Sequence, residues 1–273
     1  MPELPEVETT MRGLRQHLRG ARIANVVVRD GRLRWPVPSN LAERVRGAEV
    51  EGLSRRAKYI LIRVTGGTLL LHLGMSGRVQ VLSRAGARPV GPHDHVDLCL
   101  AGGDVVRLTD PRRFGCLLWT DRPADEHPLL RHLGPEPLRA GFDGEYLFAR
   151  SRGRRVAIKS FLMDAKVVVG VGNIYASEAL YHARIQPLRA AGRISQRRYD
   201  RLAEAVQTTL RAAIGVGGTT LRDFRDQDGQ LGYFGRQLAV YGRAGERCGA
   251  CGALIRTTRV GQRSTFWCPR CQR

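Results

Sequence analysis

The sequence contains no uninterrupted apolar run near 18 residues, the length that a membrane-spanning helix requires. It also lacks the basic and then apolar start of a secretory signal peptide, because Glu3, Glu6 and Glu8 stand there. Hydrophobic residues nevertheless make up 42% of the chain. We therefore expect a globular cytoplasmic protein, and its 273 residues suffice for one large domain or two of medium size.

Acidic residues are in the minority. The chain has 45 Lys and Arg residues against 25 Asp and Glu residues, a formal net charge of +20. Such an excess favours a polyanionic partner, either nucleic acid or an acidic membrane surface, although a generally basic protein without such a partner is the alternative. Arginine far outnumbers lysine, which suits planar contacts with phosphates and bases but could also reflect a GC-rich gene.

Cysteine is sparse except at the C-terminus. Cys99 and Cys116 lie alone in apolar runs, and we expect them to be buried thiols. The other four form a motif with the spacing of a four-cysteine zinc ribbon, Cys248-x2-Cys251-x16-Cys268-x2-Cys271. Four thiolates leave no open coordination position, so we expect one structural Zn2+, with another thiophilic metal as the alternative.

The hairpin expected between the two cysteine pairs carries Arg256, Arg259 and Arg263. Three arginines in one short ribbon of a basic protein indicate a nucleic-acid-binding finger. The alternative is a solvated hairpin tip.

Most of the first 120 residues form runs in which apolar and polar residues often alternate, as in β-strands. A helix over 5–20 comes first, with Val7, Met11, Leu14 and Leu18 on one face. A short helix is expected over 40–46 with Ser39 as its cap, and turns at Asp30-Gly31, Gly66-Gly67 and Gly102-Gly103. The expected strands are 22–29, 48–54, 57–65, 68–73, 78–82, 95–100, 104–109 and 116–120.

A proline-rich stretch separates these strands from a helical region. In this region the apolar residues recur with the period of a helix, and we expect helices over about 143–151, 156–163, 174–183 and 195–214. The resulting fold class is α+β: an N-terminal β-sandwich with flanking helices, then a C-terminal helical domain with a helix–two-turn–helix motif and a zinc ribbon. We assign 1–120 to the sandwich domain, 121–140 to a linker, 141–235 to the helical domain and 236–273 to the ribbon.

The first residues carry a candidate nucleophile. An initiator Met before a small residue is usually removed, which would leave Pro2 with a free secondary amine beside Glu3 and Glu6. An α-amino group titrates near 7.7–8.0, roughly two units below a lysine side chain, so more of it is unprotonated at neutral pH. Such amines form Schiff bases, and adjacent carboxyl groups can move the protons. The alternative is an ordinary capped helix start.

A second pattern spans 156–183. Gly170 and Gly172 permit tight turns between two helices, and Asn173 is expected to be the N-cap of the second. Exposed amides at such a helix start bind phosphate well, and Lys159 and Lys166 lie nearby. Most turns of this kind are only caps, so the pattern by itself is weak.

Five segments in the same order resemble bacterial formamidopyrimidine-DNA glycosylases. They are Pro2-Glu3-Leu4-Pro5-Glu6-Val7-Glu8-Thr9, His72-Leu73-Gly74-Met75-Ser76-Gly77, Thr109-Asp110-Pro111-Arg112-Arg113-Phe114-Gly115, Gly170-Val171-Gly172-Asn173-Ile174-Tyr175 and the cysteine ribbon. The resemblance covers essentially the whole chain. The related endonuclease VIII branch shares Pro2-Glu3 but usually departs from Leu4-Pro5-Glu6-Val7, so the oxidised-purine branch is favoured.

The resemblance implies a bifunctional glycosylase and abasic-site lyase acting on 8-oxoguanine and formamidopyrimidines in duplex DNA, as a monomer. Pro2 would attack C1′ of the damaged nucleotide, release the base and form an imine that leads to β,δ-elimination. Glu3 would move protons at the sugar, and Glu6 would hold the deoxyribose or the N-terminus. Lys159 matches a lysine that assists at the lesion.

The resemblance also implies DNA contacts. Lys58, Asn173 and Arg263 match phosphate-gripping positions, and His72 lies in a DNA-binding motif. Residues 217–234 match a loop that covers the extruded base, with Gly218, Thr219, Thr220 and Tyr233 as candidates; a plain surface loop is the alternative. The trio inserted where the base has left would be Met75, Arg112 and Phe114, although such apolar residues are more often part of a core.

Two other functions remain open from sequence. An endonuclease VIII-like enzyme would keep the mechanism and act on oxidised pyrimidines. A non-catalytic zinc-ribbon DNA-binding protein would explain the charge and the cysteines, but it would have no use for a free prolyl amine beside two carboxylates.

Overall fold

The structure is a computed structural model that describes residues 2–83, 88–219 and 237–273. It divides into two compact units. The first contains Met1–Arg131 and Gly217–Tyr233, and the second contains His132–Val216 and Phe234–Arg273, as far as these ranges are described. The predicted linker is thus divided between the units after Arg131.

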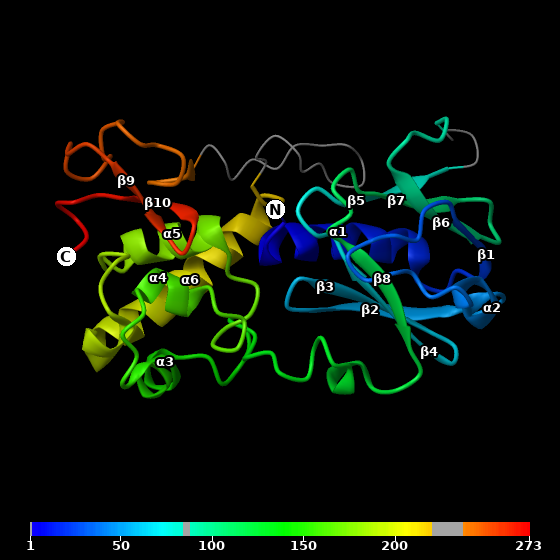
Figure 1. The fold of residues 1–273 in the computed structure, drawn as a ribbon, viewed down its shortest axis with the longest axis horizontal. Coiled ribbons are helices and arrows are strands. Elements are labelled where there is room, and N and C mark those ends of the chain that lie inside the picture. Colours follow the sequence, from blue (N-terminus) through cyan, green and yellow to red (C-terminus); the bar gives the residue numbers. More distant parts are fainter. Residues whose placement is uncertain (1, 84–87, 220–236) are drawn as a thin grey trace. The chain divides into compact units, whose positions relative to one another are not determined.

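The first unit is a sandwich of two four-stranded antiparallel sheets, as predicted (Figure 1). One sheet has the order β1-β6-β7-β5, and the other has the order β2-β3-β4-β8. Their facing side chains form one core, to which Ile62 and Leu71 of one sheet and Val96 and Leu108 of the other belong. The strands are β1 (Ile23–Val28), β2 (Val50–Arg56), β3 (Tyr59–Val64), β4 (Gly67–His72), β5 (Arg78–Leu82), β6 (Asp94–Leu100), β7 (Val105–Thr109) and β8 (Cys116–Thr120).

Helix α1 (Leu4–Leu18) packs its apolar face on this sandwich, in contact with β2, β3 and β5 (Figure 1). Leu4, Val7, Leu14 and Leu18 are each at most 1% exposed. Because burial of one such side chain stabilises a fold by about 1.5–3 kcal/mol, this face fixes the start of the helix firmly.

Three sequence predictions in this unit need correction. Asp30-Gly31 is not a hairpin turn, because β1 is followed by an irregular segment, in which Arg34 N–H donates to Gly115 O, and then by helix α2 (Leu41–Val45). The cap position of α2 is Asn40 and not Ser39. Cys116 is buried as expected, whereas Cys99 is half-buried.

The second unit is helical. Helix α6 (Gln196–Gly215) packs against α3 (Gly144–Ser151) and α5 (Asn173–His182), and α4 (Ile158–Leu162) packs on α5. The hairpin of β9 (Arg256–Val260) and β10 (Arg263–Trp267) lies on α5 (Figure 1). Short 3-10 turns cover Ala124–Glu126 in the first unit and Ala191–Arg193 in the second. In the described part of the chain, no helix is both long and apolar enough to cross a membrane.

Candidate functional site

The N-terminal acids lie at the start of α1 in the first unit. Glu3 and Glu6 are each 2% exposed, and Pro2 is also buried. One carboxylate oxygen of Glu6, Oε2, accepts the backbone N–H of Glu3 at 2.8 Å, half of a helix-capping pattern. The alternative prediction of a capped helix start is therefore confirmed, but capping does not explain the bond made by the other carboxylate oxygen of Glu6.

That second oxygen, Oε1, accepts the backbone N–H of Thr219 at 2.7 Å. Thr219 is the third residue of the segment 217–234 predicted to cover an extruded base, and it lies 213 residues further along the chain than Glu6. Gly218 has a φ of +86°, and a Cβ there would lie 3.0 Å from the same Glu6 oxygen. Glycine is thus required at this position both for its backbone conformation and for the close approach. Thr220 and Tyr233, also predicted for this loop, lie outside the described residues.

Lys58 and His72 lie at neighbouring strand ends in the same unit. Lys58 is in the two-residue turn between β2 and β3, and His72 ends β4, where it pairs with Tyr59 across the sheet. Burial, together with the positive charges of Lys58 and Arg34, lowers the pKa of His72 to about 4. The His72 Nδ1 atom accepts the backbone N–H of Gly74 at 2.9 Å, so in the neutral ring Nε2 carries the proton and can donate to a phosphate.

The proposed gap-filling trio is on the surface of the first unit and not in its core. Met75 is 37% exposed and Phe114 is 42% exposed. The guanidinium of Arg112 lies over the Phe114 ring, 4.9 Å from its centroid. Exposed apolar side chains beside an arginine fit the wedge that the sequence suggested.

Asp110, which was not predicted from the sequence to be a site residue, holds together the two loops that carry Met75 and Phe114. Its buried carboxylate accepts the Ser76 hydroxyl at 2.8 Å and the Gly115 N–H at 2.8 Å. A Cβ on Gly74 would lie 2.4 Å from the Gly115 nitrogen, so the two loops meet backbone to backbone. His95 has a structural role here, because its Nε2 lies 2.8 Å from the Asp110 carbonyl oxygen.

In the second unit, Asn173 is the first residue of α5, and Gly172 occupies the cap position in place of the predicted Asn173. The Asn173 side-chain amide can therefore point elsewhere, and its Nδ2 donates to the Tyr241 hydroxyl at 3.4 Å. Tyr241 was missed from sequence; its ring packs edge-on against Phe266 of β10. The backbone N–H of Tyr241 donates to the buried Glu178 carboxylate of α5 at 2.8 Å.

Lys159 is 1% exposed, and its ammonium group is directed into the ribbon. Its Nζ donates to the Ser264 carbonyl at 3.0 Å and to the Thr265 hydroxyl at 2.9 Å. These bonds tie α4 to the strand that begins with Arg263. Lys159 is thus linked to the exposed Arg263 through Thr265, whose hydroxyl also donates to the Arg263 carbonyl oxygen at 3.2 Å.

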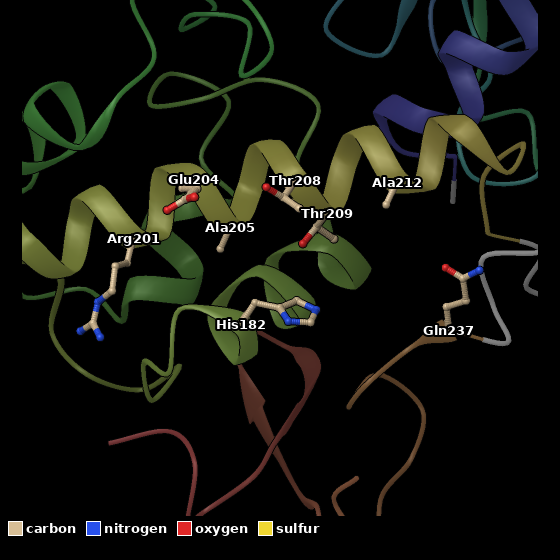
Figure 2. A pocket seen from close by; sticks show the side chains of 8 residues that line it. All are labelled: His182, Arg201, Glu204, Ala205, Thr208, Thr209, Ala212 and Gln237. Atoms are coloured by element: carbon tan, nitrogen blue, oxygen red, sulfur yellow. The ribbon is translucent and has the colours of Figure 1, made fainter. Parts of the chain in front are cut away.

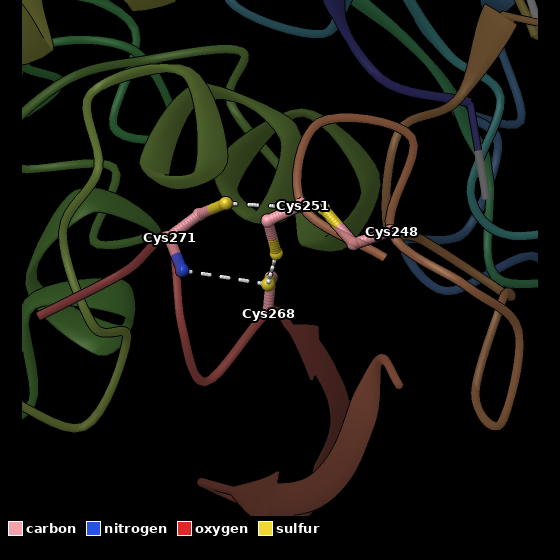
Figure 3. Close-up of side chains that lie close together, drawn as sticks. All are labelled: Cys248, Cys251, Cys268 and Cys271. Atoms are coloured by element: carbon pink, nitrogen blue, oxygen red, sulfur yellow. Dashed lines mark hydrogen bonds between the residues drawn. The ribbon is translucent and has the colours of Figure 1, made fainter. Parts of the chain in front are cut away.

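The four C-terminal cysteines form a metal-binding cluster, with their Sγ atoms all within 4.8 Å of one another (Figure 3). The Cys251–Cys268 and Cys248–Cys271 sulfur pairs are 3.5 Å and 3.9 Å apart. Tetrahedral zinc with Zn–S bonds of about 2.3 Å requires sulfur atoms about 3.8 Å apart. The residues fit a structural Zn2+ held by all four thiolates.

A pocket of about 520 Å3 also lies in the second unit (Figure 2). Arg201, Glu204 and Thr208 of α6 and His182 of α5 line it, with Gln237 at one end. None of the residues predicted from the sequence to carry chemistry is among its lining residues.

Three protein-family models match successive parts of the chain. Residues 1–117 match the Formamidopyrimidine-DNA glycosylase N-terminal domain, and residues 133–225 match the Formamidopyrimidine-DNA glycosylase H2TH domain. Residues 245–273 match the zinc finger found in FPG and IleRS. Formamidopyrimidine-DNA glycosylases of Halorhodospira halophila and Syntrophotalea carbinolica are 59% and 55% identical, each over 100% of both chains.

Solved structures show the same similarity. The MutM (Fpg) protein of Thermus thermophilus is 38% identical with a TM-score of 0.89, over 99% of this chain and 98% of that one. The Lactococcus lactis Fpg in complex with DNA containing an abasic site is 30% identical with a TM-score of 0.91, over 99% of both chains. With 55% and 59% identity to the Syntrophotalea carbinolica and Halorhodospira halophila proteins over their full length, the chain belongs to the formamidopyrimidine-DNA glycosylase family.

Proposed function

We propose that Pro2 is the nucleophile with which this DNA glycosylase excises oxidised purines from duplex DNA and then cuts the strand as an abasic-site lyase. The observation that carries the proposal is the pair of bonds made by Glu6. They join the backbone next to the nucleophile with the first residues of the loop assigned to the extruded base. A buried carboxylate bonded to both segments supports the proposal that the two segments serve one reaction.

The chemistry follows from an N-terminal secondary amine. With Met1 removed, the Pro2 nitrogen attacks C1′ as the C1′–N bond to the damaged base breaks, and Glu3 moves a proton at the sugar. Opening of the sugar ring gives an imine. The positive charge of that imine acidifies the C2′ proton, so the 3′ phosphate leaves by elimination, and a second elimination releases the 5′ phosphate.

Each unit supplies groups that would bind DNA phosphates. In the first unit, the Lys58 ammonium supplies charge and His72 supplies a neutral N–H donor. In the second unit, Asn173 and Arg263 supply a side-chain amide and a guanidinium. Lys159 would assist at the lesion through the hairpin that it supports.

The trio of Met75, Arg112 and Phe114 would fill the space that the extruded nucleotide leaves. Two exposed apolar side chains restore stacking, and the guanidinium can hydrogen-bond to the unpaired cytosine. Gly218, Thr219, Thr220 and Tyr233 would contact or cover the base on the other side. We also propose that the protein acts as a monomer in the cytoplasm.

Oxidised pyrimidines are the second candidate substrate class, because the Lactococcus lactis Fpg has also been solved with DNA containing an oxidised pyrimidine.

Borohydride trapping tests both candidates. A covalent protein–DNA adduct should form on duplexes with 8-oxoguanine opposite cytosine or with an abasic site, and release of an oxidised pyrimidine should be slower. An undamaged duplex is the control. A protein that binds the lesion duplexes yet never traps would be a binding protein and not a lyase.

A further inference from the structure

The turn that carries Lys58 has an unusual backbone. Arg56 and Tyr59 form the last pair between β2 and β3, so Ala57 and Lys58 alone make the connection. Ala57 has a φ of +54°, a left-handed conformation that residues with a Cβ rarely adopt. Such a conformation persists only where neighbouring groups hold it, and it often marks a functional site.

Arg55 holds this turn. Its Nη1 donates to the Ala57 carbonyl oxygen at 2.7 Å, and its Nε donates to the Glu8 carboxylate at 2.9 Å. The Arg55 side chain is only 9% exposed. A guanidinium suits this task because its planar fork can donate in two fixed directions at once, whereas an ammonium is a point charge.

Glu8 connects the turn to α1 through its bond with Arg55. It lies on the helix that starts directly after Pro2 and Glu3, and the same helix is bonded to β2 a second time, from Arg15 to the Leu53 carbonyl at 2.9 Å. The other Glu8 oxygen accepts from Arg12, one turn along α1, whose side chain is 59% exposed. The bond that reaches the sheet is therefore the one to Arg55.

We infer that Glu8 and Arg55 are positioning residues that hold the Lys58 ammonium at a fixed place relative to the N-terminal nucleophile. Neither residue needs to touch DNA. Glu8 orients Arg55, Arg55 fixes the Ala57 carbonyl, and the turn then directs Lys58. The inference rests on the phosphate-gripping role of Lys58 in the proposed function.

A double-mutant cycle tests it. Arg55→Lys keeps the charge but cannot donate to Glu8 and Ala57 together, and Glu8→Gln weakens the bond from the other side. Each should slow single-turnover nicking of an abasic-site duplex by about ten- to a hundredfold, as misplacement of a catalytic-site group does. Arg12→Ala is the matched control; it removes the exposed partner of the same carboxylate and should change the rate by no more than about twofold.

The readout specific to positioning is the rate in a Lys58→Ala background. The Arg55→Lys/Lys58→Ala protein should be no slower than Lys58→Ala alone, with melting temperatures showing that both remain folded. Equal slowing by Arg55→Lys in the two backgrounds, or no slowing where Lys58→Ala is slow, would overturn the inference and leave the proposed function standing. A Lys58→Ala protein with the full rate would remove the proposed role of Lys58, and this inference with it.

Discussion

The backbone N–H of Thr219 donates to the Glu6 carboxylate at 2.7 Å, and Glu6 binds the Glu3 N–H with its other oxygen. A buried carboxylate with both oxygens used in this way has little freedom to turn. The start of the loop proposed to cover the base is thereby fixed to the start of α1, the helix that directly follows the proposed nucleophile Pro2 and Glu3. In the proposed mechanism, capture of the base and attack on the sugar are therefore linked through the Glu6 side chain.

Gly218→Ala should separate the two activities. The added Cβ would approach Glu6 Oε1 to 3.0 Å and disturb the bond from Thr219. We expect release of 8-oxoguanine to slow by about tenfold or more, whereas nicking of a preformed abasic site, which has no base to cover, should change little. Gly217→Ala is the control, since Gly217 has a similar φ of +80° but nothing within 4 Å of the added Cβ. Equal effects of the two substitutions would show that backbone strain alone is responsible.

Phe114→Ala should reduce activity without a matching loss of stability. The ring is 42% exposed, so the free energy of unfolding should change by only about 0.5 kcal/mol. The loss of a stacking wedge should instead slow excision from duplex DNA. Leu117→Ala, at a nearby position that is 2% exposed, should cost about 2–5 kcal/mol of stability. A large drop in the melting temperature for Phe114→Ala would place that ring in the core.

His72 should make stability depend on pH. Burial lowers its pKa to about 4 in the folded protein, whereas in the unfolded chain it titrates near 6.5. The unfolded chain therefore takes up a proton first, so the contribution is complete above pH 6.5 and is lost as pH falls toward 4, by roughly 2–3 kcal/mol. His72→Asn keeps an acceptor for Gly74 but does not titrate. Denaturant unfolding between pH 4 and 7.5 should show a flatter profile for this variant, and parallel profiles would contradict the assignment.

Asp94 should contribute at lower pH. Its buried carboxylate accepts two bonds from Arg88 and one from Thr109, and although burial alone would raise its pKa, these bonds lower it well below the usual range. The stabilisation is present above pH 4 and is lost as pH falls below it. Asp94→Asn should lower the stability of the fold at pH 7 and make that stability less sensitive to acid. Thermal melting at pH 7 and at a pH below 4 measures both effects.

Zinc removal should affect DNA binding through the ribbon. The apolar cluster around the cysteines is small, with Val240 and Ile255 as its buried aliphatic members, so the metal supplies much of the local folding energy. A chelator should weaken binding to damaged and undamaged duplexes alike and reduce the salt dependence by about one phosphate contact, that of Arg263. Cys99→Ser should retain one zinc per chain, and Cys268→Ser should not.

Local patterns predicted the elements well, and contacts distant in sequence were out of reach. Alternation and glycine turns placed the eight strands to within a few residues, and cysteine spacing located the ribbon. The Asp30-Gly31 turn was wrong because a turn signal does not say whether the next strand pairs or the chain departs. No local sequence pattern indicates the Glu6–Thr219 bond or the bonds of Asp110 to Ser76 and Gly115, because each depends on how separate segments of the chain pack.

The identity of the trapped amine tests the central claim most directly. After borohydride reduction on an abasic duplex, proteolysis and mass spectrometry should place the deoxyribose remnant on a peptide that begins with Pro2, with Met1 absent. The possible competitors are few, because the chain has only Lys58, Lys159 and Lys166 as other amines. A remnant on one of these lysines, or full nicking activity in protein that retains Met1, would contradict the account.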